Sequence, residues 1–237
     1  MFVRNTIFKA TFALWTLLFA PLIPLLWVAG TPAALIRHLT RLWARGVLAL
    51  SSLLGGIRFT VRGRANVPDG PTLIVANHQS AWETIAALVL FPDVAIVTKQ
   101  ELLAIPVIGW FLRHSPMILI DRDGSTSAMR KMLADCRRAV ADGRSILIFP
   151  EGTRKPPGNR VEFKRGVELL YRSLDISALV VAHDAGRVWH DNICLSPGEI
   201  NVSIHPPIAP GSPALQFTKT AEAALNEAVT GLAQQMA

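Results

Sequence analysis

The sequence predicts an α/β fold: a central mixed sheet of about seven strands flanked by helices, preceded by a membrane-associated helical hairpin. Two observations lead to this prediction. From residue 57 onward, short apolar runs alternate with stretches of helical periodicity, as expected for strands that are covered by helices. Before that point, residues 10–36 carry no charged side chain and are long enough to cross a bilayer. We therefore expect a membrane anchor in residues 1–56 and an α/β domain in residues 57–237.

The anchor contains two apolar stretches. Pro21 and Pro24 interrupt the first, and the second follows at residues 39–57. Two such segments would form a hairpin that dips into one leaflet, with Arg41 at headgroup level; a single transmembrane helix is the alternative. Basic residues flank the first stretch on both sides. They favour an inner, cytoplasmic membrane location with the second domain facing the cytoplasm.

Seven strands and five helices are expected after the anchor, without an internal repeat. The expected strands are residues 57–62, 72–76, 94–98, 117–120, 145–149, 178–183 and 201–205. The expected helices are residues 81–90, 106–113, 125–141, 164–173 and 213–235. In sheets of this kind, ligands bind beyond the carboxyl ends of the strands.

Composition restricts the partners of the chain. The chain is 51% hydrophobic and 17% charged, with a net charge of +7, so we expect an anionic partner such as a phosphorylated substrate or an anionic membrane surface. Nucleic acid is not expected, because the sequence has no zinc-finger spacing, RNA-binding signature or long basic helix. Its two cysteines are isolated, which indicates a reducing compartment and no metal or redox motif.

A histidine and an acid follow the expected strand at residues 72–76. His78 lies in the turn after this strand, and Ser80 and Glu83 have the spacing of a helix capping box. On one continuous helix, five residues correspond to a rotation of about 500°, which would point His78 and Glu83 apart. A turn lets the carboxylate meet one imidazole nitrogen and leaves the other free to accept a proton. The alternative is that Ser80 and Glu83 only cap the helix.

Basic residues follow other expected strands, at the same end of the sheet as His78. Lys99, Arg122, Arg154 and Lys164 each come close after a strand or open the next helix. Singly, each is most simply a solvated surface charge. Together, beside the backbone N–H groups of a glycine turn, they predict an anion site of the kind that holds a phosphate.

The turn that carries Arg154 contains three further candidate binding residues. Gly152 is expected to allow a positive φ or a close backbone approach, and Thr153 lies between it and Arg154. Glu151 is expected to accept a hydrogen bond from a substrate hydroxyl or to orient Arg154; pairing with an arginine without any further role is the alternative. A second histidine and acid, His183 and Asp184, are adjacent and point to opposite faces of a strand, so His183 is expected to be structural.

Five ordered motifs of this chain resemble those of the glycerolipid acyltransferases, in particular the enzymes that acylate 1-acylglycerol 3-phosphate. The motifs are NHQSAWE at residues 77–83, KQEL at 99–102, ILIDR at 118–122, FPEGTR at 149–154 and FKRG at 163–166. The resemblance covers about residues 61–185. The family motif is His-x4-Asp, whereas this chain has Glu83, whose extra methylene requires another rotamer. Residues 179–182 also lack the proline that is usual in the family.

The resemblance implies a reaction. A fatty acyl group would move from acyl-CoA or acyl carrier protein to the free sn-2 hydroxyl of lysophosphatidate, giving phosphatidic acid. His78 would act as the general base without an acyl-enzyme, Glu83 would orient it, and Arg122, Arg154 and Lys99 would bind the phosphate. No metal or organic cofactor is expected.

Three alternatives remain open from the sequence. The same chemistry could act on lyso-ornithine lipid or glycerol 3-phosphate. Water could replace the hydroxyl, as in a lipid esterase or thioesterase. A non-catalytic protein could use the basic residues to bind anionic membranes, although such a protein would not need a general base.

Overall fold

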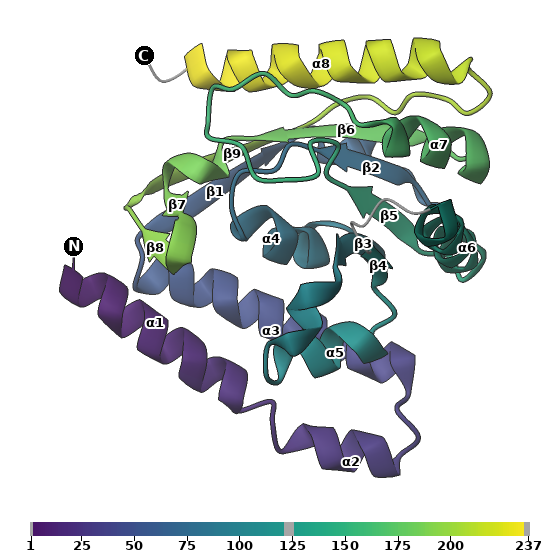
Figure 1. Cartoon of the computed structure of the whole chain (residues 1–237). Coiled ribbons are helices and arrows are strands. Elements are labelled where there is room, and N and C mark those ends of the chain that lie inside the picture. The colour runs from purple at the N-terminus through teal and green to yellow at the C-terminus, as the bar shows by residue number, and fades with distance from the viewer. Residues whose placement is uncertain (1, 121–125, 235–237) are drawn as a thin grey trace.

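The computed structural model describes residues 2–120 and 126–234. Its main sheet has the strand order β1-β9-β6-β2-β5-β3-β4 (Figure 1). These strands are β1 (Ile57–Arg62), β2 (Leu73–Ala76), β3 (Val94–Lys99), β4 (Ile118–Ile120), β5 (Ser145–Ile148), β6 (Ala178–His183) and β9 (Gly198–Ile204). A small hairpin that the sequence analysis did not predict pairs β7 (Trp189–His190) with β8 (Cys194–Leu195).

The direction of the strands confirms the prediction of a mixed sheet. The central strands β6, β2, β5, β3 and β4 are parallel to one another, whereas β9 is antiparallel to β6 and carries β1 parallel to itself. Strands β2, β5 and β6 are buried over their whole length, as expected for apolar strands covered on both faces. The carboxyl ends of the five central strands therefore lie at one end of the sheet.

Helices cover both faces of the sheet, as predicted. The helices of this part of the chain are α4 (Trp82–Leu90), α5 (Ile108–His114), α6 (Thr126–Ala141), α7 (Arg165–Leu174) and α8 (Ala214–Gln234). The first apolar core contains Trp82 of α4 and residues of the N-terminal helices. The second, on the other face, contains Met132, Leu170 and Phe217 of α6, α7 and α8. The connections also contain short 3-10 helices, which are η1 (Arg64–Asn66), η2 (Gln100–Ala104), η3 (Ala185–Arg187) and η4 (Asp191–Ile193).

The N-terminal region folds into three helices, α1 (Phe2–Leu17), α2 (Leu22–Val28) and α3 (Ala33–Leu53). The first apolar stretch is therefore not one helix; Pro21 stands at the N-terminus of α2, after a turn, because proline is disfavoured inside a helix. Helix α1 packs closely on α3: a Cβ atom on Gly46 would lie 2.3 Å from the ring of Trp15. The indole N–H of Trp15 donates to the carbonyl oxygen of Trp43 at 3.0 Å.

Helix α3 is also tied to the α/β part of the chain. Arg37 Nε donates to Asp93 Oδ2 at 3.0 Å, and Arg41 Nε donates to the carbonyl oxygen of Leu88 at 3.0 Å. Arg41, which we expected at headgroup level, thus caps a carbonyl in the last turn of α4, where a positive charge is favourable. Val47 of α3 is fully buried in the first apolar core.

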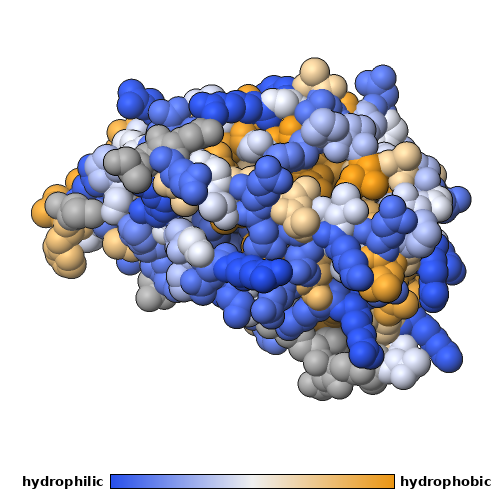
Figure 2. All heavy atoms as spheres, turned by 90° about the horizontal axis from the view of Figure 1, so that it is seen from above, coloured by the Kyte–Doolittle hydropathy of each residue, from blue (hydrophilic) through white to orange (hydrophobic). Residues whose placement is uncertain are grey.

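The outer surface of α1 and α2 is apolar. The stretch Phe2–Val28 contains an 18-residue window with a mean hydropathy of 1.9 and is, by length and composition, able to cross a membrane. Leu25, Trp27 and Val28 expose 66%, 70% and 80% of their surface, which is unusual for three large apolar side chains in one short helix. By contrast, the surface seen from the α8 side is largely hydrophilic (Figure 2).

Candidate active site

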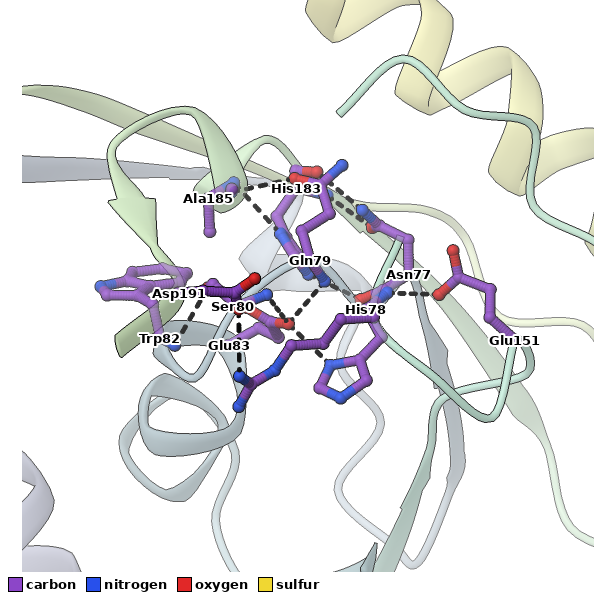
Figure 3. Close-up of polar contacts among 12 residues, drawn as sticks. Asn77, His78, Gln79, Ser80, Trp82, Glu83, Glu151, His183, Ala185 and Asp191 are labelled. Carbon is purple, nitrogen blue, oxygen red and sulfur yellow. Dashed lines mark hydrogen bonds and ion pairs between the residues drawn. The ribbon is translucent and has the colours of Figure 1, made fainter. Parts of the chain in front are cut away.

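His78 and Glu83 meet at the carboxyl end of β2. The Nδ1 atom of His78 lies 2.8 Å from Glu83 Oε1 (Figure 3). Strand β2 ends at Ala76 and helix α4 begins at Trp82, so the residues between them form the turn that folds the glutamate back onto the histidine. The side chain of Glu83 is 4% exposed and that of His78 is 17% exposed.

The Glu83 carboxylate also organises the turn itself. Its Oε1 atom accepts the backbone N–H groups of Gln79 at 2.8 Å and Ser80 at 2.7 Å, and its Oε2 atom accepts the Ser80 hydroxyl at 2.5 Å. The Ser80 oxygen in turn accepts the backbone N–H of Trp82 at 3.0 Å. Glu83 therefore accepts backbone N–H groups at the start of the helix and also binds the imidazole. Helix capping and the contact with His78, which the sequence left as alternatives, are both made by this one carboxylate.

Electrostatics keep Glu83 ionised. Burial by itself raises the pKa of the Glu83 carboxyl, but the hydrogen bonds from His78 and Ser80 are among the interactions that outweigh it and lower the pKa to about 2. An ionised carboxylate at Nδ1 requires the proton on that nitrogen, which leaves Nε2 as the basic atom of a neutral imidazole. The ring also stacks on Phe149, with centroids 4.2 Å apart, and this fixes its plane.

The main chain of His78 is held by the loop after β5. Its N–H donates to Glu151 Oε2 at 2.5 Å, and its carbonyl oxygen accepts the N–H of Lys155 at 2.8 Å. Burial raises the pKa of Glu151 to about 7. Arg154 pairs instead with Asp191, at 3.5 Å between Nη1 and Oδ1. The contact of Glu151 with the backbone of His78 is one that the sequence analysis did not predict.

A cavity of about 1080 Å³ opens beside His78. Its lining includes Lys99, Gly152, Thr153, Arg154 and Lys164, so these sequence-predicted residues are brought together with the imidazole. Arg122, the remaining predicted binding residue, lies outside the described residues.

Gly152 has the positive φ that we expected, +68°. A Cβ atom at this position would lie 2.9 Å from Lys164 Nζ. The absence of a side chain therefore lets the ammonium group pack over the turn, where both residues line the cavity.

The other lining of the cavity is mainly apolar and comes in part from residues 1–56, which the sequence assigned to the anchor. Helix α1 contributes Phe12, the turn after it contributes Phe19, and α3 contributes Thr40 and Trp43; Phe111 comes from α5. Residues of the β7–η4 region line it as well. No spacing in the sequence indicates these contacts, because they depend on how α1 and α3 pack against the sheet.

The arrangement is suited to proton transfer next to an anionic, amphipathic ligand. It combines a basic nitrogen, an ionised carboxylate that can stabilise the imidazolium, cationic side chains and a mainly apolar cavity of about 1080 Å³. Within residues 2–120 and 126–234, no three His, Cys, Asp or Glu side chains are grouped closely enough to bind a metal ion.

Comparison with known proteins assigns the chain to a class. The family model described as Acyltransferase matches residues 58–183, more than half of the sequence, from the second residue of β1 to the end of β6. The chain therefore belongs to the acyltransferase family, as the motifs indicated.

The names of individual relatives are more specific than the family description. The chain is 36% identical over 171 residues to the 1-acyl-sn-glycerol-3-phosphate acyltransferase of Pseudomonas aeruginosa, a match that covers 72% of this chain and 66% of that protein. It is 27% identical over 194 residues to a 1-acyl-sn-glycerol-3-phosphate acyltransferase of Chlamydomonas reinhardtii, covering 80% of this chain and 58% of that one. The chain thus matches less than two thirds of the length of either relative.

The fold also matches a solved structure. The 1-acyl-sn-glycerophosphate acyltransferase PlsC of Thermotoga maritima superposes with a TM-score of 0.73, covering 96% of this chain and 97% of that one at 20% sequence identity. The similarity extends over the N-terminal helices as well as the sheet, so the whole architecture is shared.

Proposed function

We propose that this chain transfers a fatty acyl group from an acyl thioester to the free sn-2 hydroxyl of 1-acylglycerol 3-phosphate, giving phosphatidic acid. The observation that carries the proposal is the 2.8 Å contact between His78 and Glu83 beside a cavity that has cationic side chains and a largely apolar lining. A lysophosphatidate has the two matching parts, an anionic phosphate and an apolar acyl chain. The names of the relatives from Pseudomonas and Chlamydomonas support this choice of acceptor.

In the proposed reaction, His78 Nε2 removes the proton from the acceptor hydroxyl as its oxygen attacks the thioester carbonyl. The tetrahedral intermediate then collapses, the C–S bond breaks, and the leaving thiolate of CoA or acyl carrier protein takes the proton from the imidazolium. Glu83 stabilises that imidazolium through Nδ1. General-base assistance of this kind contributes about 10²–10⁴-fold to a rate.

The cavity suggests how each substrate binds. Lys99, Arg154 and Lys164 at its basic part, together with Arg122 of the family motif, would bind the phosphate. The Lys99 ammonium and nearby backbone N–H groups are candidate donors to the thioester oxygen as it gains negative charge. The apolar lining from α1, α3 and α5 would hold a fatty acyl chain.

We further propose that the exposed apolar surface of α1 and α2 inserts into the inner membrane and that the α/β domain faces the cytoplasm. Leu25, Trp27 and Val28 would enter the lipid, since large apolar side chains gain free energy on leaving water. Residues 1–56 would then serve as the anchor of the catalytic domain, residues 57–237, while α1 and α3 also supply one wall of its cavity.

The test uses membranes that contain the full chain, labelled acyl-CoA and lysophosphatidate. Wild-type protein should form phosphatidic acid, and a folded His78→Ala variant should lose nearly all of this activity. Lyso-ornithine lipid and glycerol 3-phosphate are offered in parallel to identify the acceptor. Release of free fatty acid without acceptor would instead indicate a thioesterase, and a His78→Ala variant with the wild-type rate would refute the mechanism.

A further inference from the structure

The residues on both sides of His78 are bound to one distant segment, residues 183–186 at the end of β6 and the start of η3. The first link joins Asn77 to His183. The Asn77 amide donates to the carbonyl oxygen of His183 at 2.9 Å, and its Oδ1 accepts the backbone N–H of His183 at 2.9 Å (Figure 3). Asn77 is 1% exposed, so water does not compete for these bonds.

The imidazole of His183 adds a third bond to the same residue. Its Nε2 atom lies 2.7 Å from the carbonyl oxygen of Asn77, and its Nδ1 atom accepts the backbone N–H of Ala185 at 3.3 Å. These partners require the proton on Nε2. Burial lowers the pKa of His183, so the ring is neutral and acts as a fixed donor to the peptide group that joins Asn77 to His78.

The second link joins Gln79 to Gly186. The Gln79 side-chain oxygen accepts the backbone N–H of Gly186 at 3.0 Å. The approach is close, because a Cβ atom on Gly186 would lie 2.9 Å from the Cβ of Gln79 and 3.0 Å from Cγ of Pro157. Gln79 also donates its backbone N–H to Glu83 Oε1, the oxygen that holds the imidazole of His78.

We propose that His183 and Gly186 are positioning residues for the catalytic base: they hold Asn77 and Gln79, and thereby fix His78 against Glu83. This inference rests on the proposed function, because it assumes that His78 is the base. It extends the expectation that His183 is structural by assigning the residue an effect on the chemical step. A displacement of about 1 Å in a catalytic group can cost about 10²-fold in rate.

The first experiment compares two substitutions of His183 in the full-length protein. His183→Phe keeps a buried ring but removes the donor to Asn77, whereas His183→Gln retains an N–H that can reach the same oxygen. We expect His183→Phe to lower kcat for phosphatidic acid formation by about 10- to 100-fold, with little change in KM for either substrate. His183→Gln should recover most of this loss.

A second variant disturbs the other link, between Gln79 and Gly186. In Gly186→Ala, the added methyl group must displace Gln79, so kcat should again fall by at least about tenfold with an unchanged KM. Leu225→Ala is the control, because this fully buried residue of α8 belongs to the apolar core on the other face of the sheet. It should lower the midpoint of thermal unfolding while the folded protein keeps the wild-type kcat.

The outcomes separate this inference from the proposed function. If His78→Ala is inactive but Gly186→Ala and His183→Phe have the wild-type kcat, the positioning role is refuted and the mechanism stands. A loss in Leu225→Ala as large as that in the two variants, or no recovery in His183→Gln, also refutes the role of His183. If His183→Phe does not fold, the kcat of Gly186→Ala decides whether the positioning role stands. Adding Gly186→Ala to His78→Ala should reduce the residual rate no further, since no base remains to be positioned.

Discussion

Glu151 accepts the backbone N–H of His78 at 2.5 Å, whereas Glu83 binds the imidazole of the same residue, so two carboxylates hold His78. The two carboxylates differ in environment. Glu83 receives several hydrogen bonds and has a pKa of about 2, whereas burial raises the pKa of Glu151 to about 7. This difference separates their roles and leads to the first two predictions.

Glu151→Gln should change how stability depends on pH. A carboxyl whose folded-state pKa is raised binds its proton more tightly in the folded protein, so wild-type stability should fall as the pH rises from about 4.5 to about 7. The variant lacks this fall, because glutamine can still accept the N–H of His78 without a charge. The difference approaches about 3 kcal/mol above pH 7. Urea unfolding at several pH values tests this, with the exposed Glu227→Gln as a control that should leave the wild-type profile unchanged.

Glu83→Gln should reduce kcat by about 10²-fold, less than His78→Ala. The amide can still accept from Nδ1, but the negative charge that stabilises the imidazolium is lost. The same substitution should remove an acid-induced loss of stability: the lowered pKa of Glu83 stabilises the fold above pH 4.5, and this contribution disappears as the pH falls toward 2. Steady-state kinetics and acid unfolding measure the two effects. A wild-type kcat in this variant would remove the orienting role of Glu83.

Arg154→Ala should raise KM for lysophosphatidate by about tenfold while leaving KM for acyl-CoA nearly unchanged. The guanidinium lines the cavity next to Gly152 and Thr153, and a charge-assisted hydrogen bond to phosphate contributes about 1.5–3 kcal/mol. Arg160→Ala is the matched control, because Arg160 pairs with Glu222 and is not among the cavity-lining residues in the described part of the chain. Equal effects of the two substitutions would argue for general surface charge instead of a phosphate site.

Thr40→Phe should shift the preference of the enzyme toward shorter acyl chains. Thr40 lies on α3, is 5% exposed and lines the apolar part of the cavity, so a larger side chain would fill space that a long acyl chain needs. Activity with short-, medium- and long-chain acyl-CoA measures the shift. Thr6→Phe is the control, since Thr6 makes the same hydroxyl-to-backbone contact on the exposed surface of α1. An unchanged chain-length profile in Thr40→Phe would place the acyl chain elsewhere.

The double variant Leu25→Asp, Trp27→Asp should bind liposomes at least about tenfold more weakly. Both side chains are mostly exposed, so their replacement should leave thermal stability nearly unchanged. Leu215→Asp serves as control, because Leu215 is 61% exposed on α8 and should not enter the lipid. Co-sedimentation with vesicles measures the binding, and wild-type binding by the double variant would contradict the proposed anchoring surface.

Local patterns in the sequence predicted most of the elements of the fold. The alternation of apolar runs and helical stretches indicated the seven strands of the main sheet and the helices α4 to α8, with most limits shifted by one to three residues. The anchor was predicted less well: Pro21 marked a break, but the division into α1, α2 and α3 did not follow from hydropathy, because apolar helices and apolar turns have the same composition. The β7–β8 hairpin is too short to give a periodic signal.

The sequence by itself determined the contact of His78 with Glu83, because the two residues are five positions apart and the turn between them has its own capping chemistry. Only the tertiary structure decided that Glu151 and His183 reach the same turn, from 73 and 106 positions along the chain. The same holds for α1 and α3, which form part of the cavity wall. Hydrogen bonding within a turn depends on neighbouring residues, whereas contacts between strands and helices depend on strand order, register and packing, which the whole chain sets together.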